Sequence, residues 1–183
     1  MRIAFLLLVV TPILAWFLVK PLRVITPEIV GVKCYEGGLC LDSSNIEEAE
    51  KLRLDAIEFL SGEVGVFKYS PRVIFCSTWE CANKFGLGKR SAVTVRGFGS
   101  AISPRAWKPY YVRHELIHQL QAQELGLLKC LTLPPWIIEG MAYGLSEDPR
   151  QPLKEPWQGY RNKFLDWRKS VKNSDMWSKA AQE

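Results

Sequence analysis

The two histidines of this chain, His114 and His118, lie four residues apart and enclose Glu115. Residues four apart lie on one face of an α-helix, so a helix here would direct both imidazoles at one point, with Glu115 beside them. The H-E-x-x-H pattern is typical of a helix whose histidines bind one zinc ion and whose glutamate is a general base. The spacing therefore predicts a helix and a metal site on it.

A zinc site that keeps one position open for water takes three protein ligands, commonly His, Glu, Asp or Cys. The segment Pro134–Tyr143 is predicted to be a second helix, with Pro135 in its first turn. Glu139 is its one carboxylate among apolar residues, and such a carboxylate favours a nearby cation. A first helix that ends near Gly126 leaves room for the second to return across the metal. Glu139 is therefore the predicted third ligand, and Cys130, between the two helices, is the alternative.

These motifs, with Trp136-x-x-Glu139-Gly140-x-Ala142 after the histidines, resemble the gluzincin branch of zinc metallopeptidases, particularly its compact peptidase MA-like domains. The similarity covers roughly residues 70–148. It implies an α+β fold in which a small mixed sheet packs on the zincin-type active-site helix and the glutamate helix. It also implies that Ala92–Arg96 is an edge strand to which an extended peptide can pair. The alternative is an ordinary strand inside the sheet.

By this resemblance, His114, His118 and Glu139 would bind one Zn²⁺, and Glu115 would be the catalytic base in hydrolysis of a peptide or protein substrate. Zinc lowers the pKa of its bound water to about 7, so hydroxide becomes available near neutral pH. The developing oxyanion usually needs a further donor. The candidates are Tyr143, one turn after Glu139, and Tyr160 with Arg161 on a later helix. The alternative for each tyrosine is an ordinary packed aromatic side chain.

The segment Ile3–Val19 contains no charged residue over 17 positions, which is at the lower limit for a helix that spans a membrane. We expect residues 1–23 to form one transmembrane anchor, followed by a single catalytic domain in residues 24–183. A cleaved signal peptide is the alternative, but its apolar region is usually shorter and ends at small residues. Basic residues on both sides of the segment leave its orientation open.

The five cysteines include two close pairs, Cys34 with Cys40 and Cys76 with Cys81. Such pairs favour disulfides, and so a domain on the periplasmic or extracellular side of the membrane. Reduced, buried cysteines are the alternative, since sequence does not guarantee that the two α-carbons come close enough. Cys130 is expected to be unpaired and buried.

The remaining chain predicts strands followed by helices, which supports the α+β class. We expect a hairpin in Val30–Leu41 and a capping box at Ser44–Glu47 that opens a helix. A strand at Arg72–Cys76 and a short helix at Trp79–Phe85 follow. From Glu155 the tail carries aromatic and basic residues at helical spacing. Such a helix packs its aromatic side on the domain, which we favour, or lies on an anionic membrane.

The formal net charge of +5 is modest, and we expect it to be diffuse, so no nucleic-acid partner is predicted. Three function classes remain: a membrane-anchored zinc metallopeptidase, a catalytically inactive relative that acts as a binding or assembly module at the membrane, and a membrane adaptor without metal. A structural zinc site normally has four protein ligands and no open position. Three candidate ligands with an adjacent base favour the enzyme.

Overall fold

A mixed β-sheet lies at the centre of residues 8 and 10–183, the part of the chain that the computed structural model describes. Its strand order is β1-β2-β3-β5-β4. The outer pairs, β1 with β2 and β4 with β5, are antiparallel, and the inner pairs are parallel. The predicted α+β class is confirmed, and β4 is an edge strand as expected. The strands are β1 (Lys33–Cys34), β2 (Leu39–Leu41), β3 (Val73–Phe75), β4 (Ala92–Val95) and β5 (Gly99–Ile102).

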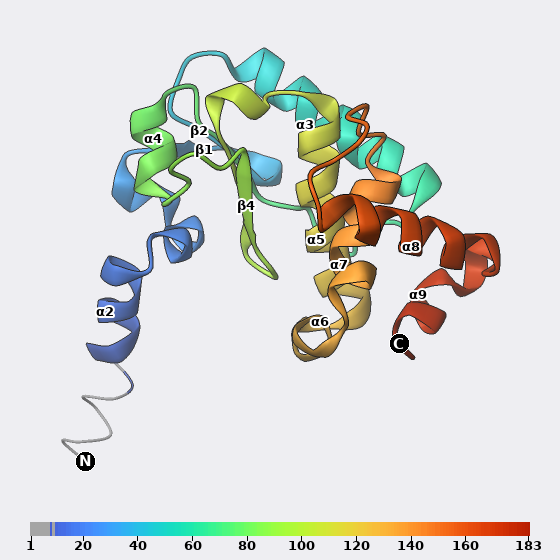
Figure 1. The fold of residues 1–183 in the computed structure, drawn as a ribbon. Helices are drawn as coiled ribbons and strands as arrows, with labels where there is room; N and C mark the ends of the chain where they lie inside the picture. The colour runs from blue at the N-terminus through green and yellow to red at the C-terminus, as the bar shows by residue number, and fades with distance from the viewer. Residues whose placement is uncertain (1–7, 9) are drawn as a thin grey trace.

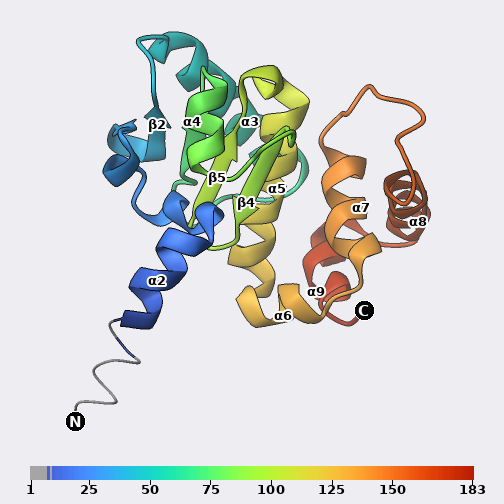
Figure 2. The same ribbon diagram turned by 60° about the vertical axis from the view of Figure 1, so that its left-hand side comes forward.

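Helices cover both faces of the sheet, and Figures 1 and 2 show α5 between the sheet and α7, with α8 beyond α7. The helix α5 ends at Gly126, its C-cap residue. The φ of this residue is 81°, a value that glycine adopts more easily than other residues. The helix α7 begins at a proline, as predicted. The helices are α2 (Thr11–Leu18), α3 (Ile46–Glu63), α4 (Trp79–Lys84), α5 (Pro109–Leu125), α6 (Leu127–Thr132), α7 (Pro135–Leu145), α8 (Trp157–Lys169) and α9 (Met176–Ala180).

Alternate strand residues face two separate apolar clusters, because successive side chains of a strand point to opposite faces. In β3, Val73 and Phe75 pack in the larger cluster with the buried side of α5, including Leu116 and Leu120. Ile74 between them packs in a smaller cluster on the other face. The helix α5 is thus fixed to the sheet by apolar side chains, while His114 and His118 face Glu139 on α7.

The start of α3 differs from the predicted capping box. Asn45, not Ser44, is the N-cap residue, and no side chain caps the helix in that way. Instead Asn45 Nδ2 donates to Glu48 Oε2 at 2.5 Å. The polar pair therefore exists one residue later than predicted, because the first turn begins one residue later.

The predicted transmembrane helix is not supported by the described residues, since none of their helices is long and apolar enough to cross a membrane. Its first part, residues 1–7 and 9, lies outside the described residues. Its last part forms α2, which continues into the 3-10 helix η2 (Lys20–Ile25). Arg23 in η2 donates to the carbonyl of Lys84 at 3.0 Å, and Val24 is fully buried. Arg23, the last residue of the expected anchor segment, therefore contacts α4.

Both predicted disulfides are present. Cys34 and Cys40 face each other across the β1–β2 hairpin with α-carbons 4.1 Å apart. Cys76 and Cys81 join the end of β3 to α4 with α-carbons 5.4 Å apart. Cys130 is free and buried, as expected.

The tail helix α8 packs its aromatic side on α7, the arrangement that we favoured. Phe164 is fully buried, and the ring centroid of Trp167 lies 6.1 Å from that of Trp136 on α7. The two helices approach closely at Gly140: a β-carbon there would lie 2.4 Å from the carbonyl oxygen of Tyr160. The glycine after Glu139 is therefore needed to hold α7 against α8.

Candidate metal centre

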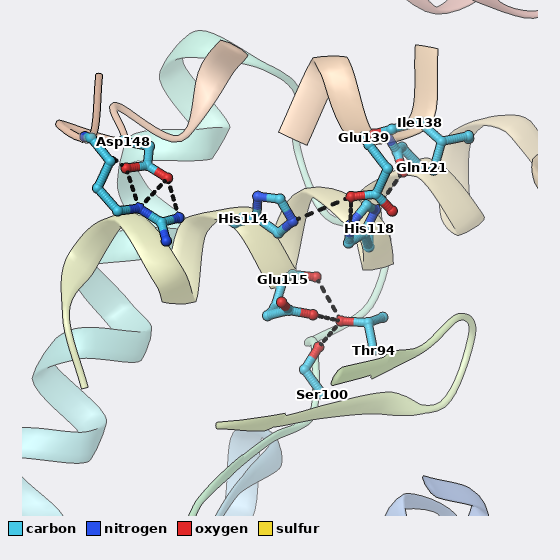
Figure 3. A network of polar contacts seen from close by, with 10 residues as sticks. Thr94, Ser100, His114, Glu115, His118, Gln121, Ile138, Glu139 and Asp148 are labelled. Carbon is cyan, nitrogen blue, oxygen red and sulfur yellow. Dashed lines mark hydrogen bonds and ion pairs between the residues drawn. The ribbon is translucent and has the colours of Figure 1, made fainter. Parts of the chain in front are cut away.

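Three side chains from α5 and α7 converge on one point (Figure 3). His114 Nε2 lies 3.7 Å and His118 Nε2 lies 3.6 Å from Glu139 Oε2. One ligand atom from each residue lies within 4.8 Å of the others, so this group is able to hold a metal ion. The structure thus brings together the three residues predicted as ligands. Cys130 is not part of the group; its thiol donates to the carbonyl of Gln121 instead.

The donor set fits a divalent cation, and two of its three donor-atom separations are close to those of a zinc site. Tetrahedral zinc with bonds of about 2.0–2.1 Å separates neighbouring N and O ligands by about 3.4 Å. The two measured nitrogen-to-oxygen distances exceed this value by only a few tenths of an ångström. Two imidazoles and one carboxylate leave a fourth position for water or substrate. The residues therefore match an open site better than a closed structural one.

The carboxylate of Glu139 is held in its charged form. Burial acts to raise its pKa, but hydrogen bonds and positive charge from His114 and His118 outweigh burial and lower that pKa strongly. Burial likewise acts to lower the pKa of His118, but contact with Glu139 raises it overall. A cation bound here would take the place of the proton, as metal binding to such ligands usually does.

Gln121 fixes the orientation of the His118 ring. The Nε2 amide of Gln121 donates to the carbonyl of Ile138 at 2.9 Å, which identifies its Oε1 as an acceptor. Because Oε1 lies 2.9 Å from His118 Nδ1, this ring nitrogen must carry the proton and donate. His118 Nε2 then presents its lone pair to the centre, as a metal ligand does. The amide of Gln121 also ties α5 to α7, the helix that carries Glu139.

Glu115 is buried beside the centre, and the edge strand holds its carboxylate. Thr94 Oγ1 on β4 donates to Glu115 Oε2 at 2.6 Å and lies 2.7 Å from Ser100 Oγ on β5. Ser100 Oγ also accepts from Gln119 Nε2 at 2.8 Å, and this same amide donates to the carbonyl of Arg72. Figure 3 shows the Thr94 hydroxyl bonded both to Glu115 and to Ser100, below α5.

The direction of this chain of hydrogen bonds is fixed by its two ends. The amide nitrogen of Gln119 only donates, and a carboxylate only accepts. Ser100 must therefore donate to Thr94, and Thr94 must donate to Glu115. Aligned hydrogen bonds polarise one another in a buried site. These hydrogen bonds hold Glu115 Oε2 in place and leave Oε1 as the oxygen that can accept a proton.

The centre opens into a cleft of about 880 Å³. One wall is β4 and the residue before it, Ser91. The edge of β4 that faces away from β5 has no strand partner within the described sheet. The other wall comes from α7 and from the loop that follows it. An extended chain entering the cleft would therefore run beside both the edge strand and the three ligands.

Tyr143 and Tyr160 occupy different surroundings. Tyr143 lines the cleft, and its ring centroid lies 4.4 Å from that of His114. Burial, aided by the charge of Glu139, raises the pKa of Tyr143 to about 12, so its hydroxyl stays protonated and able to donate. Tyr160 is not among the described residues that line the cleft; its ring packs on Trp157 at 5.9 Å. Arg161 is buried and donates to the carbonyls of Asp148 and Arg150, so it supports that loop.

Several polar residues of the site were missed in the sequence. Gln121 stands three positions after His118, a helical spacing that could have indicated contact. Ser100 and Gln119 gave no such signal. They come together because β4 and β5 pair in one register and α5 packs on that pair.

Comparison with models of known protein families, with curated proteins and with solved structures gave no match. The resemblance to gluzincins therefore depends on the residues and geometry described above.

Proposed function

We propose that the protein is a gluzincin-type zinc metallopeptidase that hydrolyses peptide bonds, with its domain held at a membrane by the N-terminal apolar segment. The observation that carries the proposal is the convergence of His114, His118 and Glu139 on one point, with Glu115 buried beside them. The two disulfides support a domain in an oxidising compartment, periplasmic or extracellular.

When bound, zinc would supply a Lewis acid and lower the pKa of a water molecule to about 7. His114, His118 and Glu139 would hold it, with the ring of His118 oriented by Gln121. Glu115 accepts the proton of the attacking water on Oε1 and later delivers it to the leaving amine. Tyr143, which lines the cleft, would donate a hydrogen bond to the oxyanion that develops on the carbonyl.

The alternative, a catalytically inactive binding module, is favoured by one observation. Thr94 donates a hydrogen bond to Glu115 Oε2, so one of the two carboxylate oxygens is already engaged within the protein. In that case zinc would bind and peptides would occupy the cleft, but no bond would be cleaved.

The two functions are separated by an assay on a diverse peptide library with the zinc-loaded full-length protein. The peptidase predicts new amino termini that appear with the wild type and disappear in Glu115→Gln, while both proteins retain zinc. Glu124→Gln is a matched control, since Glu124 also lies on α5 but pairs with Lys68. Cleavage that persists in Glu115→Gln, or no cleavage by the zinc-loaded wild type, would contradict the peptidase.

A further inference from the structure

The cleft is lined by an excess of basic side chains that the modest net charge does not reveal. Six basic residues line it, against two acidic ones, Glu115 and Glu139, which both belong to the centre. In the whole chain the balance is 24 to 19. The positive charge is therefore concentrated at the cleft, contrary to the diffuse distribution expected from sequence. The six are Lys89, Arg90, Arg96, Arg105, Arg150 and Lys154.

Most of this charge is not neutralised by the protein. Among the described residues, Arg150 is the one member of the six with a carboxylate partner, Asp148. Arg105 donates to the carbonyl of Lys89, and Arg90 to that of Gly86. Backbone carbonyls orient a guanidinium group but carry no net charge. Within the same described residues, the buried Nε of Arg96 has no hydrogen-bond partner.

Most of these charges, those of Lys89, Arg90, Arg105 and Arg150, gather near the amino end of β4, whereas Arg96 follows its carboxyl end. Lys89 precedes that strand and is joined to Arg105, while Arg150 Nη1 donates to Tyr111 in the first turn of α5 at 3.0 Å. Burial acts to raise the pKa of Tyr111, but a hydrogen bond with Ser91 and the positive charges of Arg150 and Arg105 lower it overall. Figure 3 shows Asp148, the partner of Arg150, on the His114 side of the centre. One end of the cleft is thus electropositive.

We propose that the cleft binds an acidic peptide, with side-chain carboxylates of the peptide at the basic residues Lys89, Arg105 and Lys154 that line the cleft. The proposal rests on the function proposed above in treating the cleft as a substrate site. A peptide fits better than another polyanion because the unpaired edge of β4 lies along the same cleft and offers backbone hydrogen bonds to an extended chain. Unpaired positive charges in a cleft attract and orient such a ligand.

The test uses the full-length protein with Glu115→Gln, which prevents turnover, and fluorescent peptides read by anisotropy at low salt. The Glu-containing peptide is compared with its Gln counterpart, both acetylated and amidated at their ends. The Gln sequence with a free carboxyl terminus and a short single-stranded oligonucleotide are the other probes. We expect the Glu peptide to bind about tenfold more tightly than the Gln peptide, with the difference shrinking as salt increases.

Lys89→Gln with Lys154→Gln removes two exposed charges whose side chains make no described hydrogen bond, so the fold should persist. This double variant is expected to lose most of the preference for the Glu peptide and to keep its affinity for the Gln peptide. Lys51→Gln with Lys172→Gln is the matched control, because both are exposed and neither lines the cleft. It should keep the preference intact.

Equal affinity for the Glu and Gln peptides would overturn the proposal, whether or not the wild type cleaves either one. Tighter binding of the oligonucleotide, or a preference only for the free carboxyl terminus, would also overturn it. A Glu preference that needs Lys89 and Lys154 supports it even when no cleavage is found, and in that case the peptidase alone fails.

Discussion

The hydroxyl of Thr94 lies 2.6 Å from Glu115 Oε2, so an edge-strand side chain holds the carboxylate of the proposed base. The same strand forms the wall of the cleft along which a peptide can pair. In the proposed peptidase, this one strand would therefore both bind the substrate and position the base. A shift of β4 would move both.

Replacing Thr94 by Val removes the hydroxyl but keeps the shape of the side chain. Glu115 would lose its fixed orientation, and we expect kcat to fall about tenfold while KM changes little, because the loss concerns the reacting geometry. Thr94→Ser should restore most of the rate. Thr132→Val is the control, since within the described part of the chain that hydroxyl bonds only to the carbonyl of Lys129. A Val variant as fast as the wild type would show that the hydrogen bond does not position Glu115.

Replacing Gln121 by Met removes the acceptor that orients His118. Loss of such a partner typically lowers metal affinity by about 10–100-fold, and we expect a decrease in this range for zinc. Competition with a chromophoric chelator measures it. Gln123→Met is the matched control, because Gln123 lies on the same helix but bonds to the backbone of Lys68 and Tyr69. Equal loss in both variants would contradict the role of Gln121.

Replacing Gly140 by Ala places a β-carbon 2.4 Å from the carbonyl oxygen of Tyr160 and 2.8 Å from Phe164 Cβ. The helices α7 and α8 must separate, at a cost of about 1–3 kcal/mol. For a domain of this size that lowers Tm by roughly 2–4 °C per kcal/mol. Gly62→Ala in α3 meets no atom within 4 Å and should leave Tm unchanged or higher. Thermal melts that show no difference between the two variants would contradict the close packing.

Asp148 provides a pH-dependent contribution to stability. Burial acts to raise its pKa, but hydrogen bonds and charge from Arg150 outweigh burial and hold that pKa below its usual range. A carboxyl group whose pKa is lower in the folded than in the unfolded protein stabilises the fold at pH values above its unfolded pKa, about 3.9. This stabilisation is lost as the pH falls through the folded pKa.

We therefore expect Asp148→Asn to lower Tm at pH 7 and to show a smaller fall in Tm than the wild type when the pH is lowered below about 4. Asp166→Asn is the control, since Asp166 and Lys169 form an exposed ion pair, which contributes little. Parallel Tm profiles for the wild type and Asp148→Asn would show that the pair does not stabilise the fold.

The ligands were predictable because their signals are local. Helical spacing puts His114 and His118 on one face of α5. Gly126 marks the end of α5 and Pro135 the start of α7, the helix that carries Glu139 to the two histidines. The strand β5 was not predicted, because Gly99-Ser100-Ala101 lacks the β-branched residues that identify strands. The hydrogen-bond chain to Glu115 depends on the register between β4 and β5, and no short segment encodes it.

The basic cleft was also not visible in sequence. Lys89 and Lys154 come from loops and Arg105 from the 3-10 helix η5 (Pro104–Ala106), and only the fold brings these segments to one cleft. Their local surroundings resemble those of any exposed cation. The net charge of the whole chain averages over this arrangement.

The central claim is that His114, His118 and Glu139 bind one zinc ion, and zinc stoichiometry by elemental analysis of the full-length protein tests it most directly. The account predicts close to one zinc per chain for the wild type and for Glu115→Gln, with loss in both His118→Ala and Glu139→Ala. Absence of zinc from the wild type, or zinc that persists in Glu139→Ala, would contradict the metal centre and the peptidase built on it.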